Sequence, residues 1–288
     1  MVNSTDTTYI VYSLSMPRET RPPSTTVFRN TVWDHYHRNG RSLPWRKTRV
    51  AYRIFLSEIM LQQTQVSRVT KKYREFLKVF PSFTALANAS QADVLRAWQG
   101  LGYNRRALNL HRAAAVIGER HNGRVPCDRD ALLELPGIGA ATAGSLQAFI
   151  HNIPSAFIET NIRSVFLHFF FPERGAVSDR EILPLVEKTV DRENPREWYY
   201  ALMDYGVFLK GSGNPNIRSA HYSRQSPFKG SNREVRSAIL AYVLKHGHVE
   251  KKNLYALRFP ADRVDRNVSA LEREGFIRQT EEAICPVS

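Results

Sequence analysis

The chain has 288 residues, two cysteines and a formal net charge of +14 at pH 7. Its length allows a sizeable core and more than one domain. Two cysteines exclude a disulfide framework and a four-thiolate metal site, so we expect no metal and no cofactor. No apolar run approaches the length of a membrane span and no signal segment opens the chain, which predicts a cytoplasmic protein, associated with the nucleoid if it is bacterial.

The positive charge is spread along the chain instead of being gathered in one tail. This distribution predicts a basic face on a folded body. Nucleic acid is the first partner to expect, because phosphate neutralisation supplies most of the non-specific affinity of such proteins. An acidic membrane surface is the weaker interpretation, since no basic amphipathic anchor stands out.

Residues 1–26 are rich in Ser, Thr and Pro, which predicts a disordered leader. Residues 27–210 predict an all-α domain of short helices separated by turn signals, because few stretches alternate with the period of a strand. Helices are expected over about 27–38 and 50–62, and then around 105–120, 128–135, 140–150, 160–170, 180–190 and 196–209.

Residues 211–231 are polar, basic and rich in Gly, Pro and Ser, which predicts a linker. Residues 232–288 predict a separate module, with helices at 233–246, 251–257 and 261–274 followed by a short hairpin. This order matches a winged helix, in which arginines along the third helix would form the basic side of a recognition helix. The alternative is a small packing module whose arginines are simply solvated.

The segment LPGIGAATAG (135–144) predicts a tight turn that leads into a helix. Gly137 and Gly139 allow the backbone to approach a ligand closely. The free amides at the start of the helix, helped by its dipole, would bind an anion such as a DNA phosphate. On the glycines alone, an ordinary helix corner with a glycine cap is the better interpretation.

Two glutamates are candidates for acid–base chemistry. Glu58 shares a helix face with Ile54 and Leu61, and a carboxyl in such an apolar stripe needs a partner or a raised pKa. Glu159 follows an apolar run and opens a helix, where the ionised form is favoured. One acid and one carboxylate suit the cleavage of a glycosidic bond. The alternatives are a buried glutamate with an ordinary partner and an acidic residue at a helix start.

The helix that holds Glu58 ends in the polar run Gln62-Gln63-Thr64-Gln65. These side chains could contact base edges or fill a gap in a base stack. The alternative is a solvated helix end.

The runs LPWR (43–46), SEIMLQQTQ (57–65), GLGYNRRA (100–107) and LPGIGAATAG (135–144) together resemble the helix-hairpin-helix DNA glycosylases, and most closely their adenine-specific branch. The resemblance covers about residues 28–210 and implies a two-lobed domain. It implies that Glu58 protonates the adenine ring and that Gln63 and Tyr103 enter the base stack. It also places Glu159 where the family has a catalytic aspartate. Phosphate and other DNA contacts would come from Gln62, Gly137, Gly139, Ala141 and Asn161.

Four positions depart from the family's pattern. Glu159 replaces the aspartate with a side chain one methylene longer, so its carboxylate must be repositioned or the chemistry differs. Ala141 stands where the lyases of the superfamily have a Schiff-base lysine, which predicts a monofunctional enzyme. Asn104 replaces a second tyrosine that is common in the adenine branch. Lys210 stands where the first cysteine of an iron–sulfur cluster would be, and the basic linker begins there. Lys210, Arg218 and Arg224 could then contact phosphates.

We therefore expect a monomeric base-excision enzyme that acts on double-stranded DNA with a lesion or mismatch. It would hydrolyse the N-glycosidic bond of a flipped base, with adenine in a mismatch as the first choice. Two alternatives stay open. One is a glycosylase for another damaged or mismatched base, and the other is a DNA-structure binder or regulator without catalysis.

Overall fold

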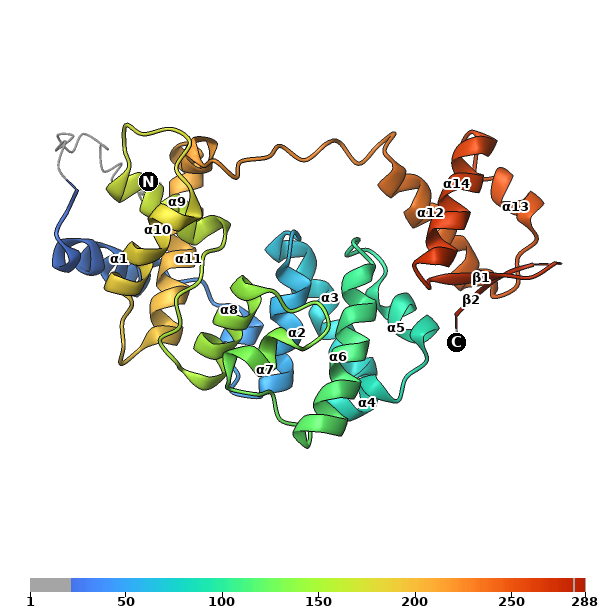
Figure 1. Ribbon diagram of the computed structural model, residues 1–288, viewed down its shortest axis with the longest axis horizontal. Coiled ribbons are helices and arrows are strands. Elements are labelled where there is room, and N and C mark those ends of the chain that lie inside the picture. Colours follow the sequence, from blue (N-terminus) through green and yellow to red (C-terminus); the bar gives the residue numbers. More distant parts are fainter. Residues whose placement is uncertain (1–21, 282, 288) are drawn as a thin grey trace, which may run out of the picture.

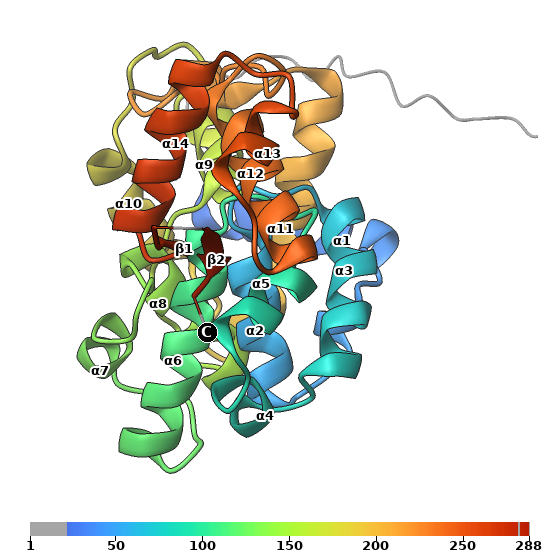
Figure 2. The same cartoon turned by 90° about the vertical axis from the view of Figure 1, so that its right-hand side faces the viewer.

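The computed structural model describes residues 22–281 and 283–287, and this part of the chain is mostly helical (Figure 1). The leader expected over 1–26 lies outside the described residues as far as position 21. Two helical lobes lie side by side (Figures 1 and 2). A small C-terminal module lies at the opposite end of the molecule from the first described helix. Two three-residue strands are the only β-strands among the described residues, so the all-α prediction is confirmed.

The central lobe, which we call the hairpin lobe, is built on the chain from residue 44 to residue 151. Its core is rich in aromatic side chains such as Trp98 and Phe76, which are fully buried. Its elements are η1 (Pro44–Arg46), α2 (Ala51–Leu61), α3 (Val66–Val79), α4 (Phe83–Ala87), α5 (Gln91–Trp98), α6 (Arg105–His121), α7 (Arg129–Leu133) and α8 (Ala140–His151).

The second lobe, which we call the α11 lobe, joins the first described helix to helices that follow the hairpin lobe in the chain. Its core centres on Trp198, Tyr199 and Phe28, which are fully buried. Its elements are α1 (Thr25–Asn39), α9 (Thr160–Phe170), α10 (Asp179–Thr189), α11 (Pro195–Ser212) and η2 (Pro215–Arg218).

Local signals in the sequence account for the helix ends and for one close helix contact. Ser24 caps α1, and Ser178 with Glu181 forms a capping box at the start of α10. Gly206 lets α11 approach α9, because a Cβ at this position would overlap the backbone carbonyl of Asn161. The packing of α9 against α11 is thus set by a residue without a side chain.

The C-terminal module consists of α12 (Asn232–His246), α13 (Lys251–Tyr255), α14 (Ala261–Arg273), β1 (Ile277–Gln279) and β2 (Ile284–Pro286). The strands pair antiparallel, and Ile284 also exchanges backbone hydrogen bonds with Val249, which lies between α12 and α13. This is the element order that the sequence predicts for a winged helix. The identification of the module as a winged helix stays a prediction.

The module is docked against the hairpin lobe and is not tethered loosely to it. Its apolar residues continue the core of that lobe. Gln91 donates to the carbonyl of Gly275 at 2.6 Å, and Arg96 donates to that of Leu244 at 3.0 Å. Arg105 forms an ion pair with Glu274 at 2.8 Å. The two units therefore present one continuous surface.

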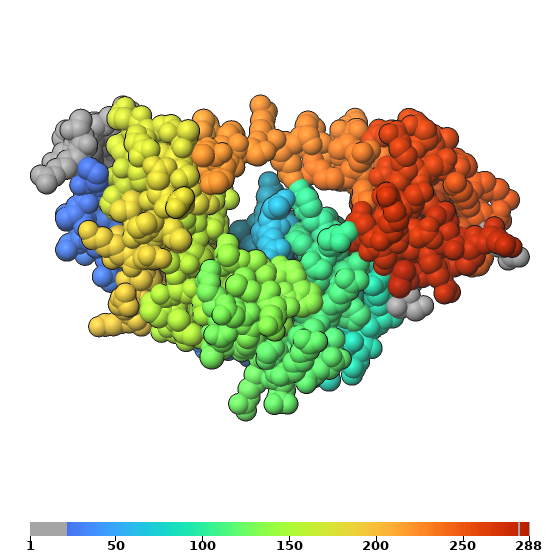
Figure 3. Space-filling model, in the orientation of Figure 1, coloured from blue at the N-terminus to red at the C-terminus, as the bar shows by residue number. Residues whose placement is uncertain are grey.

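The linker predicted over 211–231 is shorter than expected. α11 continues to Ser212, and residues 214–220 fold back on α9. Arg218 donates to the carbonyls of Leu167 (2.9 Å) and Phe171 (2.8 Å) at the end of α9. The phosphate contact expected of Arg218 stays a prediction, and in this fold its guanidinium satisfies carbonyls that the helix end leaves without partners. The remaining residues, 221–231, form a strap that passes over a hollow in the surface (Figure 3).

Arg218→Ala should lower the free energy of unfolding by about 1–3 kcal/mol, because buried carbonyls at the end of α9 lose their donor. Arg224→Ala is the matched control, since Arg224 lies exposed in the strap and should leave stability unchanged. Chemical denaturation followed by circular dichroism measures both. Equal midpoints for the two variants would show that Arg218 does not hold this segment on α9.

Candidate active site

Glu58 lies on α2 at the boundary between the two lobes. Ile54, one turn earlier on the same face, packs into the core of the α11 lobe, so Glu58 faces that lobe as well. The Ser145 hydroxyl of α8 hydrogen-bonds to the Glu58 carboxyl. Although the residue keeps some exposure, burial raises the pKa of Glu58 to about 7, and the negative charge of Glu159 adds to the rise. A large share of Glu58 is therefore protonated at neutral pH.

Arg46, Tyr200 and Asp204 form one wall beside Glu58. The Arg46 guanidinium donates to both carboxylate oxygens of Asp204 at 2.8 Å and lies 4.5 Å from the centre of the Tyr200 ring. Burial raises the pKa of Tyr200, and the nearby Glu58 charge adds to this, so the phenol stays neutral. The charge of Arg46 acts in the other direction on Glu58 and lowers its pKa.

The sequence did not single out this wall. Arg46 belongs to the run LPWR (43–46), which carries part of the family resemblance, but the sequence assigned it no role in the site. Tyr200 and Asp204 lie one turn apart on α11 in a run of buried residues. A carboxylate in such a run was the available signal, since aspartate is almost never fully buried without a partner.

Glu159 is the N-cap of α9, as its place before a helix predicted. Its Oε1 accepts from the backbone amides of Asn161 (2.9 Å) and Ile162 (3.1 Å). Its Oε2 accepts from the side-chain amide of Asn161 at 3.2 Å. These donors fix the orientation of the carboxylate, and the positive end of the helix favours its charge.

Asn161 and Lys210 extend this chain of hydrogen bonds. Lys210 Nζ donates to Asn161 Oδ1 at 2.8 Å. Because an ammonium only donates, the Asn161 oxygen must face Lys210 and its nitrogen must face Glu159. Burial lowers the pKa of Lys210, although the Glu159 charge opposes this. Lys210 is therefore held beside the candidate site instead of pointing freely into the linker.

Two exposed turns on the hairpin lobe carry the predicted wedge residues. Gln63, after α2, and Tyr103, before α6, both have left-handed backbone conformations, with φ of 54° and 47°. Such conformations are uncommon for residues other than glycine and cluster at functional sites. Gln62 differs from its neighbour, because its side chain donates to the Thr142 hydroxyl at 3.2 Å. We call Gln62–Gln65 and Gly100–Asn104 the wedge turns.

Arg106 joins the two wedge turns, and the sequence did not reveal this role. Burial lowers the pKa of Arg106 to about 10, so it stays charged at neutral pH. Its guanidinium lies 5.6 Å from the centre of the Tyr103 ring. It donates at 2.5–3.0 Å to the carbonyls of Ile59, Met60, Gln62 and Gly102 and to the hydroxyl of Thr64.

The hairpin between α7 and α8 has the geometry of an anion site. Gly137 has a φ of 79°, and a Cβ there would overlap Asn109, so only glycine fits. Gly139 is the N-cap of α8 and offers no side chain to cap the helix. Gly139 and Ala141 are exposed, so the amides of the first turn are open to a phosphate oxygen. The DNA contacts assigned to these residues stay predictions.

The described residues contain no group of three or more His, Cys, Asp or Glu side chains that could hold a metal ion. Cys127 is exposed just before α7, and Cys285 lies in β2 of the C-terminal module. Two cysteines in separate parts of the fold do not fit the iron–sulfur cluster with four thiolate ligands that the resemblance implies. No helix of the described chain is long and apolar enough to cross a membrane.

Comparison with known proteins agrees with this geometry. The family model of the HhH-GPD superfamily base excision DNA repair proteins matches residues 56–193, which include Glu58, both wedge turns, the hairpin and Glu159. The solved structure of a thermostable thymine-DNA glycosylase has a TM-score of 0.57 and 26% identity to this chain. It covers 64% of this chain, and the match covers 86% of that protein.

The relatives named adenine DNA glycosylase include one from Mycobacterium tuberculosis and one from Buchnera aphidicola. The one from Mycobacterium tuberculosis (strain ATCC 25618 / H37Rv) is 34% identical over 257 residues, which cover 82% of this chain and 81% of the relative. The one from Buchnera aphidicola subsp. Baizongia pistaciae is 34% identical over 197 residues, 67% of this chain, but the match spans only 55% of that relative. The chain therefore belongs to the HhH-GPD superfamily of base excision DNA repair proteins and, within it, to the adenine DNA glycosylase branch.

Proposed function

We propose that this protein is a monofunctional adenine DNA glycosylase that acts as a monomer on mismatched double-stranded DNA, in the cytoplasm, or on the nucleoid if the cell is bacterial. The observation that carries the proposal is the position of Glu58, which lies between the lobes within electrostatic range of Glu159 and whose pKa burial raises to about 7. An acid and a capped carboxylate facing one cleft suit glycosidic hydrolysis. A protein that only binds DNA would have no use for a carboxyl whose pKa is raised to about 7.

The proposed reaction begins when the target adenine leaves the base stack and enters the cleft beside α2. Glu58 donates its proton to a ring nitrogen of the adenine, so the base leaves as a neutral molecule. The bond between the base and C1′ breaks, and the deoxyribose becomes an oxocarbenium-like cation. The Glu159 carboxylate stabilises this cation, and a water molecule then adds to C1′ and gives up one proton, which restores the neutral Glu58.

The neighbouring residues support these two roles. The neutral Tyr200 and the Arg46–Asp204 pair would form the wall against which the base lies, while the Asn161 amide keeps the Glu159 oxygens oriented. Gln63 and Tyr103 would fill the space that the base leaves in the duplex. The hairpin amides after Gly137 and Gly139 would hold a phosphate of the same strand.

The rate of base release should fall as pH rises through about 7, because only the protonated form of Glu58 can donate and its raised pKa lies there. Single-turnover assays on a duplex with an adenine mismatch, from pH 5.5 to 8.5, measure this. Glu58→Gln should lower the rate by about 10²–10⁴ at every pH, with DNA affinity nearly unchanged. A wild-type rate that is constant up to pH 8.5 would assign the proton donor to another group.

Glu159→Gln and Glu159→Asp both keep a side chain that can cap α9, so neither should unfold the protein. Glu159→Gln removes the charge that stabilises the sugar cation and should lower the rate by about 10²–10³. Glu159→Asp withdraws the carboxylate by one methylene and should also lower it, because the pocket is built around the longer side chain. Wild-type rates in both variants would leave Glu159 as a helix cap only.

The wild-type protein should form no covalent adduct with DNA when borohydride is added during turnover, because Ala141 has no amine to form a Schiff base. Ala141→Lys supplies a positive control, since it places an amine on the exposed first turn of α8. Denaturing gel electrophoresis separates the adduct from free DNA. An adduct with the wild type would contradict monofunctional hydrolysis.

A further inference from the structure

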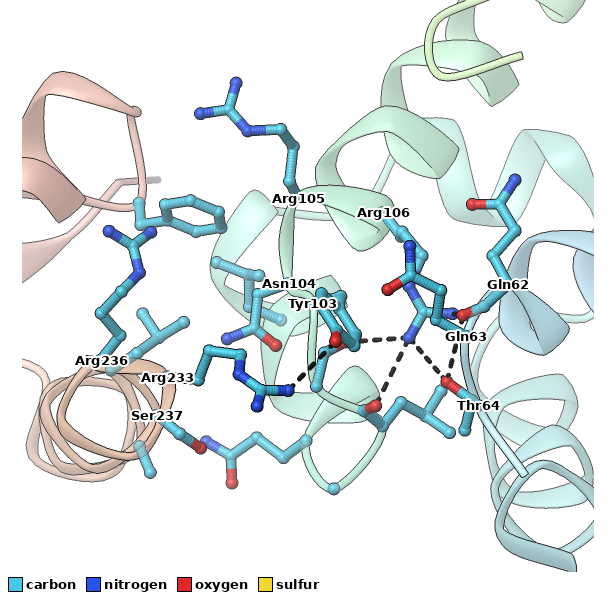
Figure 4. Close-up of a pocket in the computed structure, with 18 of the residues that line it drawn as sticks. Gln62, Gln63, Thr64, Tyr103, Asn104, Arg105, Arg106, Arg233, Arg236 and Ser237 are labelled. Carbon is cyan, nitrogen blue, oxygen red and sulfur yellow. Dashed lines mark hydrogen bonds between the residues drawn. The ribbon is translucent and has the colours of Figure 1, made fainter. Parts of the chain in front are cut away.

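A groove of about 1000 Å³ lies between the wedge turns and the C-terminal module (Figure 4). One wall consists of the wedge turns and the start of α6. The other consists of α12, through Arg233, Arg236 and Ser237, and of the strap, through Gln225 and Phe228. Its volume is that of a ligand site, and apart from Gln63 and Tyr103 none of its lining residues has a role in the proposed reaction.

The groove is electropositive. Five arginines line it (Arg68, Arg105, Arg106, Arg233 and Arg236), against one carboxylate, that of Glu274. Glu274 is shared by Arg105 at 2.8 Å and Arg236 at 2.9 Å, and Arg106 is bound to backbone carbonyls. The Arg68 side chain is exposed and has no hydrogen-bond or ion-pair partner within the described residues. The excess of guanidinium groups fits a polyanion such as a nucleic-acid strand.

Aromatic surface is also exposed at the groove. Phe228 in the strap is 55% exposed and Tyr103 in the wedge turn is 37% exposed. Bases that have left a stack are bound on such rings, with cations at the neighbouring phosphates. The lining thus suits unstacked nucleotides better than an intact duplex or a small metabolite.

Arg233 connects the C-terminal module to the wedge. Its Nη1 donates to the hydroxyl of Tyr103 at 3.1 Å, and its Nη2 donates to the carbonyl of Ser226 in the strap at 2.5 Å. In Figure 4 the Tyr103 side chain lies between Arg233 and Arg106. The position of one wedge residue therefore depends on a side chain from each unit.

Two arginines of α14, the helix that the sequence favours for DNA recognition, have partners within the module. On α14, Arg263 donates to Gly230 O at 3.0 Å and to Asn232 Oδ1 at 3.2 Å. Arg266 is paired with Asp262 on the same helix at 2.5 Å. Neither arginine lines the groove. The basic side chains of the module that reach the wedge come from α12.

The groove and the proposed catalytic cleft lie on opposite sides of the wedge turns. Glu58 lies near Ser145 of α8 and Tyr200 of α11, whereas the groove is bordered by α6 and α12. In Figure 1, α11 lies on one side of α2 and α6, and α12 lies on the other. A wedge inserted into a duplex has one strand on each side. The strand that does not enter the cleft therefore lies beside the groove.

We propose that the C-terminal module binds DNA through α12 and not through α14, and that its groove receives unstacked nucleotides of the strand opposite the target adenine. Arg233 is the positioning residue of this site, because it holds Tyr103 and stands at the groove wall. This inference rests on the proposed function for the identity of the target strand. It adds a DNA site that the catalytic scheme does not contain.

The test uses the full-length chain and a duplex with a tetrahydrofuran abasic analogue at the target position and 2-aminopurine opposite it. The fluorescence of 2-aminopurine rises when it leaves the stack, so the signal reports on the opposite strand and needs no catalysis. The wild type should raise the fluorescence on binding. Arg233→Ala should lose most of this rise, weaken binding about tenfold and lower the salt slope by about one.

Arg266→Ala is the matched control, because it removes the same charge from an exposed position of the same module. It should behave like the wild type. Tyr103→Phe removes only the hydroxyl, and the double variant with Arg233→Ala should show no further loss of fluorescence, since both changes break one contact. Melting curves by circular dichroism establish that all variants are folded.

The inference is overturned if Arg266→Ala loses affinity while Arg233→Ala does not, because the module would then bind through α14. It is also overturned if neither variant alters fluorescence, affinity or salt slope. If the wild type gives the fluorescence signal but releases no adenine from a mismatch, the proposed function fails and the groove assignment stands.

Discussion

The pairing of Arg46 with Asp204 is the interaction on which the arrangement of the two lobes depends. The Asp204 side chain is 2% exposed, and it accepts from Arg46 and from both the backbone and the side chain of Arg41. Burial alone would raise the pKa of Asp204, but these donors outweigh burial and hold the pKa below its ordinary value. A buried ion pair is best tolerated when its polar atoms are satisfied. The Asp204 oxygens are satisfied, whereas Arg46 Nε is buried without a hydrogen-bond partner among the described residues. Because η1 belongs to one lobe and α11 to the other, this contact sets the spacing of the cleft that contains Glu58.

The two carboxyl groups at this boundary between the lobes have different surroundings. Glu58 is buried near α8 and α11, and burial raises its pKa to about 7 although the hydrogen bond with Ser145 acts to lower it, so its neutral form is favoured. Glu159 receives two backbone amides and one side-chain amide at a helix start, so it is surrounded by donors that suit an anion. The difference arises from the elements that carry the two residues and not from the residues themselves, which are chemically identical. Two equal carboxyl groups can therefore take the roles of acid and anion in one site.

The sequence predicted features that follow from a spacing within one helix or turn. It did not predict the side-chain contacts that connect one helix to another. The helices, the hairpin glycines and the apolar face of Glu58 follow from spacings of three or four residues, and each appears at its expected place. The assignments to Arg106 and Arg218 did not follow, because a long guanidinium reaches acceptors whose position only the tertiary fold determines. Arg218 belongs to the segment predicted as a basic linker, and Arg106 belongs to the run GLGYNRRA (100–107), which carries the family resemblance. In the fold both guanidinium groups donate to backbone carbonyls. The net charge of +14 therefore includes arginine side chains that are not free to bind a partner.

The segment after α11 shows how a fold of this family is held without four thiolates. Asn216 is buried and donates to the carbonyl of Thr160 at 2.9 Å, at the beginning of α9, while Arg218 binds carbonyls at its end. The same segment thus spans both ends of one helix by neutral and charge-assisted hydrogen bonds. Since Glu159 is the N-cap of that helix, any displacement of α9 would displace the carboxylate with it. The side chains that hold residues 214–220 on α9 therefore fix the position of the Glu159 carboxylate as well as the fold.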